Sequence, residues 1–300
     1  MPLASRIRKL GSGGGRLGEK GSVSDEPSSE CGRGGRPAAR ADRGRPQVHP
    51  RDGHAGDRLL DLSGGGGAFG WGSAGAGAGF VRFAGSERAA DLVLSRFPEV
   101  VLAPGAADAL VIGCGWDESL RDPARQALAE HAGPVVLDAG ALLDRGLRAE
   151  VGTPAVLTPH PGEARRLWEQ VGGDGPLPTD LTEAARALSG ATGSTVVLKS
   201  ARTLVATPDR VWEYRARTAW PGVAGAGDVL AGVIGSVLAR HWRAQTTANL
   251  GDVVAAAVWL HGEAGAHAAG LTSAGAPTHP IRASDIIRGL APAWQSLPRG

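Results

Sequence analysis

Residues 109–140 read ALVIGCGWDESLRDPARQALAEHAGPVVLDAG and carry the pattern that decides the fold. Two short apolar runs, ALVIG and PVVLDAG, stand on either side of a stretch with helical character, 118–132. Apolar runs of this length, rich in Val and Leu, are typical of parallel strands that helices cover on both faces. The segment therefore predicts a strand, a helix and a second, parallel strand.

The same alternation continues toward the C-terminus. Further apolar runs at 155–159 and 195–200 predict strands, and the runs TLVAT and VWEYRA around Pro208 and Asp209 predict an antiparallel hairpin at one sheet edge. Helices are expected at 162–171, at 180–192 with Thr179 or Asp180 as the cap, and at 227–240, 249–268 and 283–295. We therefore expect a three-layer α/β/α fold with a mostly parallel central sheet and a ligand crevice at the carboxyl ends of its strands.

Residues 1–74 differ from the rest of the chain in composition. Of the 47 glycines, 21 fall within residues 1–79, and residues 1–60 carry 12 Lys and Arg against 7 Asp and Glu, so the remainder is slightly acidic. Residues 1–58 contain almost no apolar run and bury too little surface to offset the entropy of ordering. We predict a disordered or aberrant leader over 1–74, with out-of-frame translation of a GC-rich region as one hypothesis. The folded domain is expected over 75–300, with its sheet truncated at the N-terminal strand if that leader is genuine.

Composition also excludes several classes of protein. The two cysteines, Cys31 and Cys114, lack the spacing of a zinc site or a disulfide framework and are expected to be free thiols. No apolar stretch has the length of a signal-peptide core or a membrane helix. No basic cluster is interleaved with aromatic residues, as nucleic-acid-binding proteins would require. We therefore expect a cytoplasmic protein that binds neither membranes nor nucleic acid.

The stretch VAGAGD at 223–228 opens a predicted helix whose apolar residues follow at helical spacing. Glycines at such a start expose backbone N–H groups, and the helix dipole adds partial positive charge, so Gly225, Ala226 and Gly227 predict a phosphate-binding anion hole. Asp228 lies in the first turn and is expected to face the same crevice. A first-turn aspartate that only offsets the helix dipole is the alternative.

Lys199 is the only lysine after residue 20 in a chain that otherwise uses arginine as its cation. It ends an apolar strand, and a compact ammonium group suits phosphate oxygens as a point charge. The alternative is an ordinary exposed lysine at a strand end. The following turn, Ser200 to Thr203, can add further N–H and hydroxyl donors to the same anion.

Two further loops follow predicted strands. In LTPHPGE, two prolines fix the path of the chain on either side of His160, so its imidazole is presented in a defined place; the alternative is a loop histidine that makes one backbone hydrogen bond. In Gly113-Cys114-Gly115, a tight turn allows the backbone to approach a ligand.

Five segments, in this order and spacing, resemble one known family. They are LTPHPGEARRL, VVLKSARTLVATP, WPGVAGAGDVLAGVIGSVLA, AAAVWLHGEAGAHAA and PIRASDIIRGL. Together they are similar to the ADP-dependent (S)-NAD(P)H-hydrate dehydratase family, the C-terminal YjeF domain of the ribokinase-like superfamily, from about Gly79 to Leu297. The resemblance implies a ribokinase-like fold and a repair enzyme that uses ADP and Mg²⁺ to convert 6-hydroxy-tetrahydro-NAD(P) to NAD(P)H, with release of AMP and phosphate.

The resemblance also implies roles for individual residues. Asp228 would be the catalytic base and would contact the hydrate, and Gly115 and His160 would line the hydrate site. The nucleotide would be held by Lys199, Ser200, Ala201, Arg202, Thr203, Gly225, Ala226 and Gly227. No metal ligand is assigned.

The sequence departs from the family pattern in three places. The family's strand, Gly-Ser turn and helix ahead of Gly79 are not recognisable, Gly140 stands where the family often has a second aspartate, and Val223 replaces a common threonine. Two other functions stay open: a ribokinase-like kinase for a small-molecule hydroxyl group, and an inactive nucleotide-binding protein. The resemblance further implies a homo-oligomer and a separate NAD(P)H-hydrate epimerase as a partner.

Overall fold

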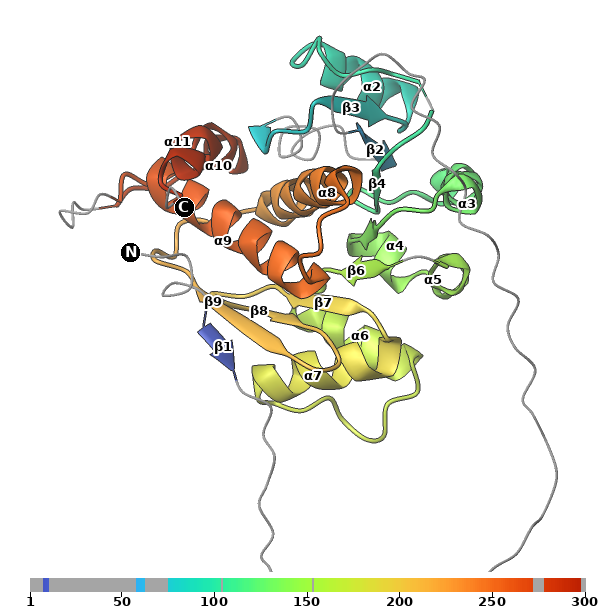
Figure 1. Ribbon diagram of the computed structural model, residues 1–300, viewed down its shortest axis with the longest axis vertical. Helices are drawn as coiled ribbons and strands as arrows, with labels where there is room; N and C mark the ends of the chain where they lie inside the picture. Colours follow the sequence, from blue (N-terminus) through green and yellow to red (C-terminus); the bar gives the residue numbers. More distant parts are fainter. Residues whose placement is uncertain are drawn as a thin grey trace, which may run out of the picture. The chain divides into compact units, whose positions relative to one another are not determined.

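The computed structural model describes residues 8–10, 58–62, 75–103, 105–152, 154–271 and 278–297. Among these residues, no helix combines the length and the apolar character that crossing a membrane requires. A single large sheet with helices on both faces organises this part of the chain (Figure 1).

The sheet has nine strands among the described residues, in the order β1-β9-β8-β7-β6-β5-β4-β2-β3. Neighbours from β3 through β2, β4, β5 and β6 to β7 are parallel, whereas β7, β8, β9 and β1 pair in antiparallel fashion. The strands are β1 (Arg8–Leu10), β2 (Arg58–Leu62), β3 (Phe80–Phe83), β4 (Ala109–Ile112), β5 (Val135–Leu137), β6 (Ala155–Leu157), β7 (Thr195–Leu198), β8 (Arg202–Ala206) and β9 (Val211–Arg215). The mostly parallel sheet and the antiparallel hairpin of β8 and β9 are confirmed. The hairpin does not form the sheet edge, however, because β1 pairs with the outer side of β9.

Helices cover both faces of the sheet (Figure 1). They are α2 (Glu87–Leu94), α3 (Arg121–Glu130, after a 3₁₀ turn at Glu118–Leu120), α4 (Ala139–Leu143), α5 (Arg145–Glu150), α6 (Pro161–Gln170), α7 (Leu181–Thr192), α8 (Ala226–Ala244), α9 (Leu250–Ala268), α10 (Ala283–Arg288) and α11 (Leu290–Gln295). Helix α7 begins at Asp180, whose side chain accepts hydrogen bonds from the N–H groups of Thr182 and Glu183, so Asp180 rather than Thr179 is the cap.

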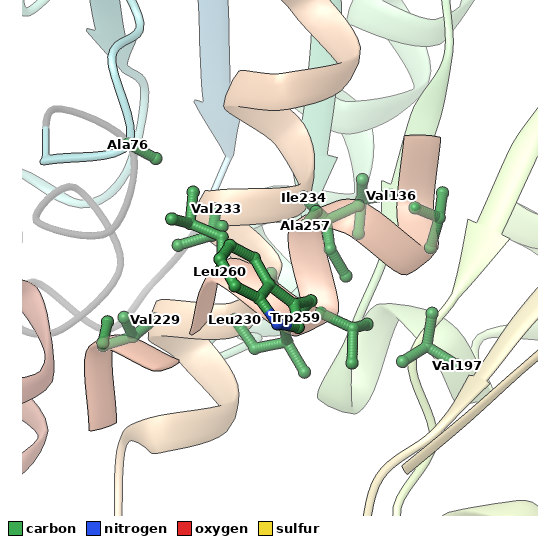
Figure 2. Close-up of a cluster of buried hydrophobic side chains, with 14 of the residues drawn as sticks. Ala76, Val136, Val197, Val229, Leu230, Val233, Ile234, Ala257, Trp259 and Leu260 are labelled. Atoms are coloured by element: carbon green, nitrogen blue, oxygen red, sulfur yellow. The ribbon is translucent and has the colours of Figure 1, made fainter. Parts of the chain in front are cut away.

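Successive side chains of the buried strands point to opposite faces of the sheet, so the hydrophobic core has two layers. In β5, Val136 packs with α8 and α9 on one face, whereas Val135 and Leu137 pack with α3 to α7 on the other. Figure 2 shows the first layer, where Val136 lies among side chains of α8 and α9, including Ile234. Burial of both faces explains why these strands are continuous apolar runs in the sequence.

The N-terminal segment differs from the prediction. Residues 1–74 were expected to form no ordered part of the domain, yet β1 pairs with β9, and β2 lies inside the sheet between β4 and β3. Leu59 of β2 is fully buried, and α8 approaches it closely because Gly235 has no side chain; a Cβ there would lie 2.3 Å from Val111 and 3.1 Å from Leu59. The expected truncation of the sheet is therefore wrong at β2. Residues 11–57 and 63–74 lie outside the described residues, so the leader itself remains a prediction.

Candidate active site

Four segments with polar side chains meet where the parallel strands end. Backbone hydrogen bonds continue the ladder past the strands: the N–H groups of Asp138, Thr158 and Lys199 donate to the carbonyl groups of Ile112, Leu137 and Pro159 at 2.9, 3.1 and 2.8 Å. These bonds hold the residues that follow β5, β6 and β7 side by side at the carboxyl end of the sheet. Parallel strands bring their carboxyl ends to one edge of the sheet, so these residues form the floor of the expected crevice.

Asp138 is the centre of this floor. Its side chain is 1% exposed, and its Oδ1 accepts hydrogen bonds from Lys199 Nζ and Thr158 Oγ1, both at 2.6 Å. The Cys114 thiol donates to Oδ2 at 3.6 Å. A carboxylate at this depth is tolerated because it is paired and hydrogen-bonded.

Lys199 reaches into the crevice from the end of β7. Its side chain is 17% exposed, and its Nζ lies 4.0 Å from Glu163 Oε2 as well as 2.6 Å from Asp138. Burial alone would lower the pKa of Lys199, but the charges of Asp138 and Glu163 and the hydrogen bond to Asp138 outweigh it, so the pKa is raised and the ammonium stays charged. Lys199 is therefore not an ordinary exposed lysine at a strand end.

Asp228 lies half-buried in the first turn of α8 and shares this cluster. Ligand atoms of Cys114, Asp138 and Asp228 lie within 4.8 Å of one another. Desolvation and the neighbouring charge of Asp138 raise the pKa of Asp228, and the Cys114 thiol and Lys199 only partly offset this. A carboxylate with a raised pKa is a stronger base than an exposed one.

Helix α8 begins without a side-chain cap. Its N-cap residue is Gly225, with a φ of +83° that glycine adopts without strain. The first N–H groups of a helix have no partner within the helix. The N–H group of Ala226 donates to the Val223 carbonyl at 3.1 Å, so the N–H groups of Gly227 and Asp228 are the ones left for an anion. Gly227 lies against Lys199, because a Cβ at Gly227 would be 3.3 Å from Lys199 Nζ. The predicted anion hole and the predicted cation are thus adjacent.

His160 has a structural task that the sequence did not indicate. Its Nδ1 accepts hydrogen bonds from the N–H groups of Gly162 (2.9 Å) and Glu163 (3.4 Å), and Glu163 Oε2 accepts from the His160 N–H (2.8 Å). This reciprocal capping box starts α6. The imidazole is 52% exposed at the side of the crevice, and its predicted contact with the hydrate stays a prediction.

The turn after β4 must be glycine-rich for a steric reason. Gly113 has a φ of +123°, and a Cβ there would lie 1.9 Å from the carbonyl oxygen of Asp138. This close approach places Cys114 against the Asp138 carboxylate. Gly115, also at positive φ (+61°), is exposed and open to a ligand.

The turn after Lys199 does not present every predicted phosphate donor. The hydroxyl groups of Ser200 and Thr203 donate to backbone carbonyls within the turn, both at 2.7 Å. The Arg202 guanidinium pairs with Glu213 of β9 at 2.9 Å, while Ala201 is exposed. The structure thus brings Lys199, Gly227 and Asp228 together but directs the Arg202 side chain elsewhere.

Sequence reasoning did not identify four residues of the cluster: Cys114, Asp138, Thr158 and Glu163. Asp138 could have been predicted from the sequence, because a charged residue directly after a buried parallel strand lies at the ligand-binding edge of the sheet. So could Glu163, as the third residue after a helix start. Nothing in the sequence indicated that Cys114 would lie between two carboxylates.

Comparison with known proteins identifies the family of this chain. The family model for NAD(P)H-hydrate dehydratase matches residues 60–288. The ADP-dependent (S)-NAD(P)H-hydrate dehydratase of Neisseria meningitidis is 37% identical over 191 residues, which are 57% of this chain and 61% of that relative. The bifunctional NAD(P)H-hydrate repair enzyme Nnr of Gloeobacter violaceus is 35% identical over 211 residues, 63% of this chain and 39% of the relative.

Solved structures share the fold. The ADP/ATP-dependent NAD(P)H-hydrate dehydratase of Bacillus subtilis, co-crystallized with ATP and Mg²⁺, has a TM-score of 0.64 and 26% identity, covering 82% of this chain and 92% of that one. The matched region of this chain spans less than two thirds of the length of these two curated relatives. The family model nevertheless covers well over half of this chain, and the chain therefore belongs to the NAD(P)H-hydrate dehydratase family.

Proposed function

We propose that this protein dehydrates (S)-6-hydroxy-tetrahydro-NAD(P) to NAD(P)H at the expense of ADP, which is split into AMP and phosphate. The observation that carries the proposal is the half-buried Asp228 carboxylate at the uncapped start of α8, beside Lys199. A base, a set of backbone donors and a cation are the groups that phosphoryl transfer to a hydroxyl group requires. Membership of the family supports the same reaction.

The proposed chemistry has two steps. Asp228 accepts the proton of the hydrate hydroxyl group, whose oxygen attacks the β-phosphorus of ADP, and AMP leaves. The lone pair of the ring nitrogen then expels the phosphate, and loss of a proton from the adjacent carbon completes the double bond of NAD(P)H. Phosphorylation is needed because hydroxide is a poor leaving group. The N–H groups at the start of α8 and Lys199 would stabilise the charge that develops on the transferred phosphoryl group.

The charge of the cluster supports a role for Mg²⁺. Among the described residues, the carboxylates of Asp138 and Glu163 lie 2.6 and 4.0 Å from the Lys199 ammonium, and Lys199 also acts on Asp228 by its charge. Three carboxylates thus share one cation, so a diphosphate would meet excess negative charge. Carboxylate oxygens together with phosphate oxygens are the ligands that Mg²⁺ prefers. Asp138 and Asp228, whose carboxylate oxygens lie within 4.8 Å of each other, would hold it beside the nucleotide, where it would neutralise charge on the diphosphate.

The test is direct. Purified protein is incubated with NADH hydrate and ADP, and the absorbance of regenerated NADH is followed; we expect turnover that Asp228→Asn lowers about 10³-fold. Asp174→Asn, which changes an exposed loop aspartate, is the matched control and should retain full activity. Phosphorylation of another small-molecule hydroxyl group without NADH formation would support the kinase alternative. Retained ADP binding without either reaction would support the inactive nucleotide-binding alternative.

The proposal also covers the partner enzyme, the oligomeric state and the cellular compartment. The relative from Gloeobacter violaceus, of which the matched region covers only 39%, is named a bifunctional repair enzyme. This supports a separate epimerase that supplies the S form of the hydrate to this chain. We also propose a homo-oligomer in the cytoplasm. Size-exclusion chromatography with light scattering tests the oligomer, and co-purification with an epimerase tests the partner.

A further inference from the structure

The sequence HGEAG, residues 261–265 of α9, belongs to a segment that carries the family resemblance but has no role in the proposed reaction. Helix α9 packs against α8 and against β9 (Figure 1). The chain that connects β9 to α8, residues 216–225, ends at the N-cap of α8, directly before the N–H groups that are left for an anion. We call residues 216–225 the anion loop. The HGEAG segment therefore lies on a helix that contacts the elements on both sides of this loop.

Glu263 is the acidic residue of the HGEAG segment, and it is buried. Its side chain is 1% exposed, its Oε2 accepts a hydrogen bond from Arg217 Nη1 at 2.8 Å, and its Oε1 accepts one from the Tyr214 hydroxyl group at 3.5 Å. Arg217 is the second residue of the anion loop, and Tyr214 lies in β9. A buried ion pair adds little stability compared with well-packed apolar residues, but it can fix one arrangement of the segments that it joins. The pair therefore fastens the beginning of the anion loop to α9.

The residues beside Glu263 hold the rest of the loop. A Cβ at Gly262 would lie 2.2 Å from the ring of Tyr214, and a Cβ at Gly265 would lie 2.6 Å from Cγ of Pro221. These glycines thus let α9 approach β9 and the middle of the loop more closely than a side chain would allow. Directly after the loop, the imidazole of His261 contacts the Ala226 carbonyl at 3.0 Å. The loop is therefore held against α9 at its beginning, in its middle and at its end.

Both ends of the anion loop also lie beside the proposed phosphate-binding groups. At the beginning, the N–H group of Ala216 donates to the carbonyl of Ala201, in the turn after Lys199, at 2.9 Å. At the end, Gly227 lies against Lys199. A displacement of about 1 Å in a catalytic group can cost about 10²-fold in rate, even when its cause is remote from the chemistry. The position of the loop therefore matters for the reaction as well as for the fold.

We propose that Glu263 and Arg217 are positioning residues for phosphoryl transfer. Their buried ion pair, together with the rest of the HGEAG segment, holds the anion loop so that the N–H groups of Gly227 and Asp228 face the transferred phosphoryl group. The inference rests on the proposed function, because it needs a reaction in which these N–H groups stabilise developing charge.

The experiment breaks the ion pair from each side and follows turnover of NADH hydrate with ADP. For Arg217→Met we expect kcat to fall about 10- to 100-fold, because the displaced N–H groups stabilise the transition state less well. The KM for the hydrate should change by less than about twofold, because the loss lies in the chemical step. Arg217→Lys keeps a cation opposite Glu263 and should recover most of the rate. Glu263→Gln should slow turnover as Arg217→Met does, and the double variant should be no slower than the slower single variant, because the two residues act as one unit.

Arg243→Met is the matched control. Arg243 lies near the opposite end of α8 and pairs with the buried Asp108 at 3.7 Å. Its side chain is 38% exposed, against 32% for Arg217, so each substitution takes an arginine of similar exposure away from a buried carboxylate. Urea unfolding compares the stability of the two variants. We expect Arg243→Met to keep the kcat of the wild type.

The outcomes separate this inference from the proposed function. In an active wild type, equal kcat values for Arg217→Met and Arg243→Met overturn the inference and leave the function standing, because the pair then serves the fold alone. Losses that multiply in the double variant overturn it as well.

Inactivity of the wild type overturns the proposed function, and calorimetric titration with ADP then tests the positioning. Arg217→Met should weaken ADP binding about tenfold, the effect of losing one hydrogen bond to a charged group, whereas Arg243→Met should leave it unchanged. Equal ADP affinity in the wild type and Arg217→Met overturns the inference. A wild type that neither turns over the hydrate nor binds ADP overturns both proposals.

Discussion

Two helices begin at the same crevice, and their starts are built in opposite ways. Helix α6 begins with a complete capping box, in which His160 and Glu163 satisfy each other's backbone N–H groups. Helix α8 begins at Gly225, which has no side chain to offer, and the carbonyl of its first residue, Ala226, is instead fastened by the imidazole of His261 from α9, 3.0 Å away. A capped start stabilises the fold, whereas an uncapped start keeps its donors for a ligand. The sequence motifs HPGE and GAGD thus describe two different uses of one structural element.

The largest expected effect lies at the uncapped start. Asp228→Asn removes the proposed base without changing shape, and general base catalysis contributes about 10²–10⁴-fold, so kcat/KM should fall about 10³-fold. The free energy of unfolding at neutral pH should stay equal or rise, because the raised pKa shows that the folded state disfavours the charged carboxylate. Steady-state kinetics and urea unfolding measure the two quantities. A loss of stability with unchanged activity would make Asp228 a structural residue only.

His261, whose imidazole contacts the Ala226 carbonyl at the start of α8, should make the stability of the fold depend on pH. Desolvation lowers the pKa of His261 from 6.5 to about 4, so the unfolded chain binds this proton more tightly than the folded one. Stability should therefore fall as the pH drops from 6.5 toward 4 and level off below that, by at most about 3 kcal/mol. His261→Gln keeps a donor for the Ala226 carbonyl but does not titrate. Thermal unfolding measured across this pH range should show that the stability of the variant falls less steeply than that of the wild type. Parallel stability curves for the two proteins would show that His261 does not cause the decline.

The charges of Asp138 and Lys199, which lie near the starts of both helices, should set the pH dependence of turnover through the pKa of Asp228. Asp138 raises the pKa of Asp228 by its charge, whereas Lys199 lowers it. In Asp138→Asn the repulsion is lost and Lys199 is no longer neutralised, so both changes lower the pKa of Asp228. The acidic limb of the kcat/KM profile should move to lower pH than in the wild type. Circular dichroism confirms the fold, and Thr158→Val, which removes a neutral hydrogen bond to Asp138, serves as the control. An unmoved limb would show that Asp228 does not govern it.

The smallest effect belongs to the capped start. His160→Ala removes the side-chain acceptor at the N-cap and should cost about 1 kcal/mol of stability. His160→Asn retains a capping oxygen and should restore most of that loss. If His160 also contacts the hydrate, Asn will restore stability but not the KM for the hydrate. Equal recovery of both quantities would mean that capping is the residue's only task.

Much of the fold was predictable because local pattern and long-range packing agree. The apolar runs at β4 to β7 are buried on both faces, so their composition alone identifies them as interior parallel strands. Strand β2 escaped prediction because five residues, RLLDL, lie between a polar stretch and a run of glycines. Its place is decided by β3 and β4, which come later in the chain, and no local signal shows that pairing.

The candidate site was predictable residue by residue but not as a network. Asp228, Lys199 and the glycines of α8 carried signals in their motifs, and the structure places Lys199, Gly227 and Asp228 together. The ion pair between Lys199 and Asp138 joins residues 61 positions apart, and the hydrogen bond from the Cys114 thiol to Asp138 joins residues 24 positions apart. Such pairings depend on strand order, which periodicity does not give.

The insertion of β2 between β3 and β4 has a practical consequence for anyone who shortens this chain. A version that starts at residue 75 keeps every proposed catalytic residue, yet it leaves β4 with one unpaired side and removes Leu59 from its place against Gly235. An unpaired, apolar edge of this kind is a template for association with other chains. The acceptable starting point for a trimmed protein therefore lies before Arg58, however unpromising the preceding sequence looks.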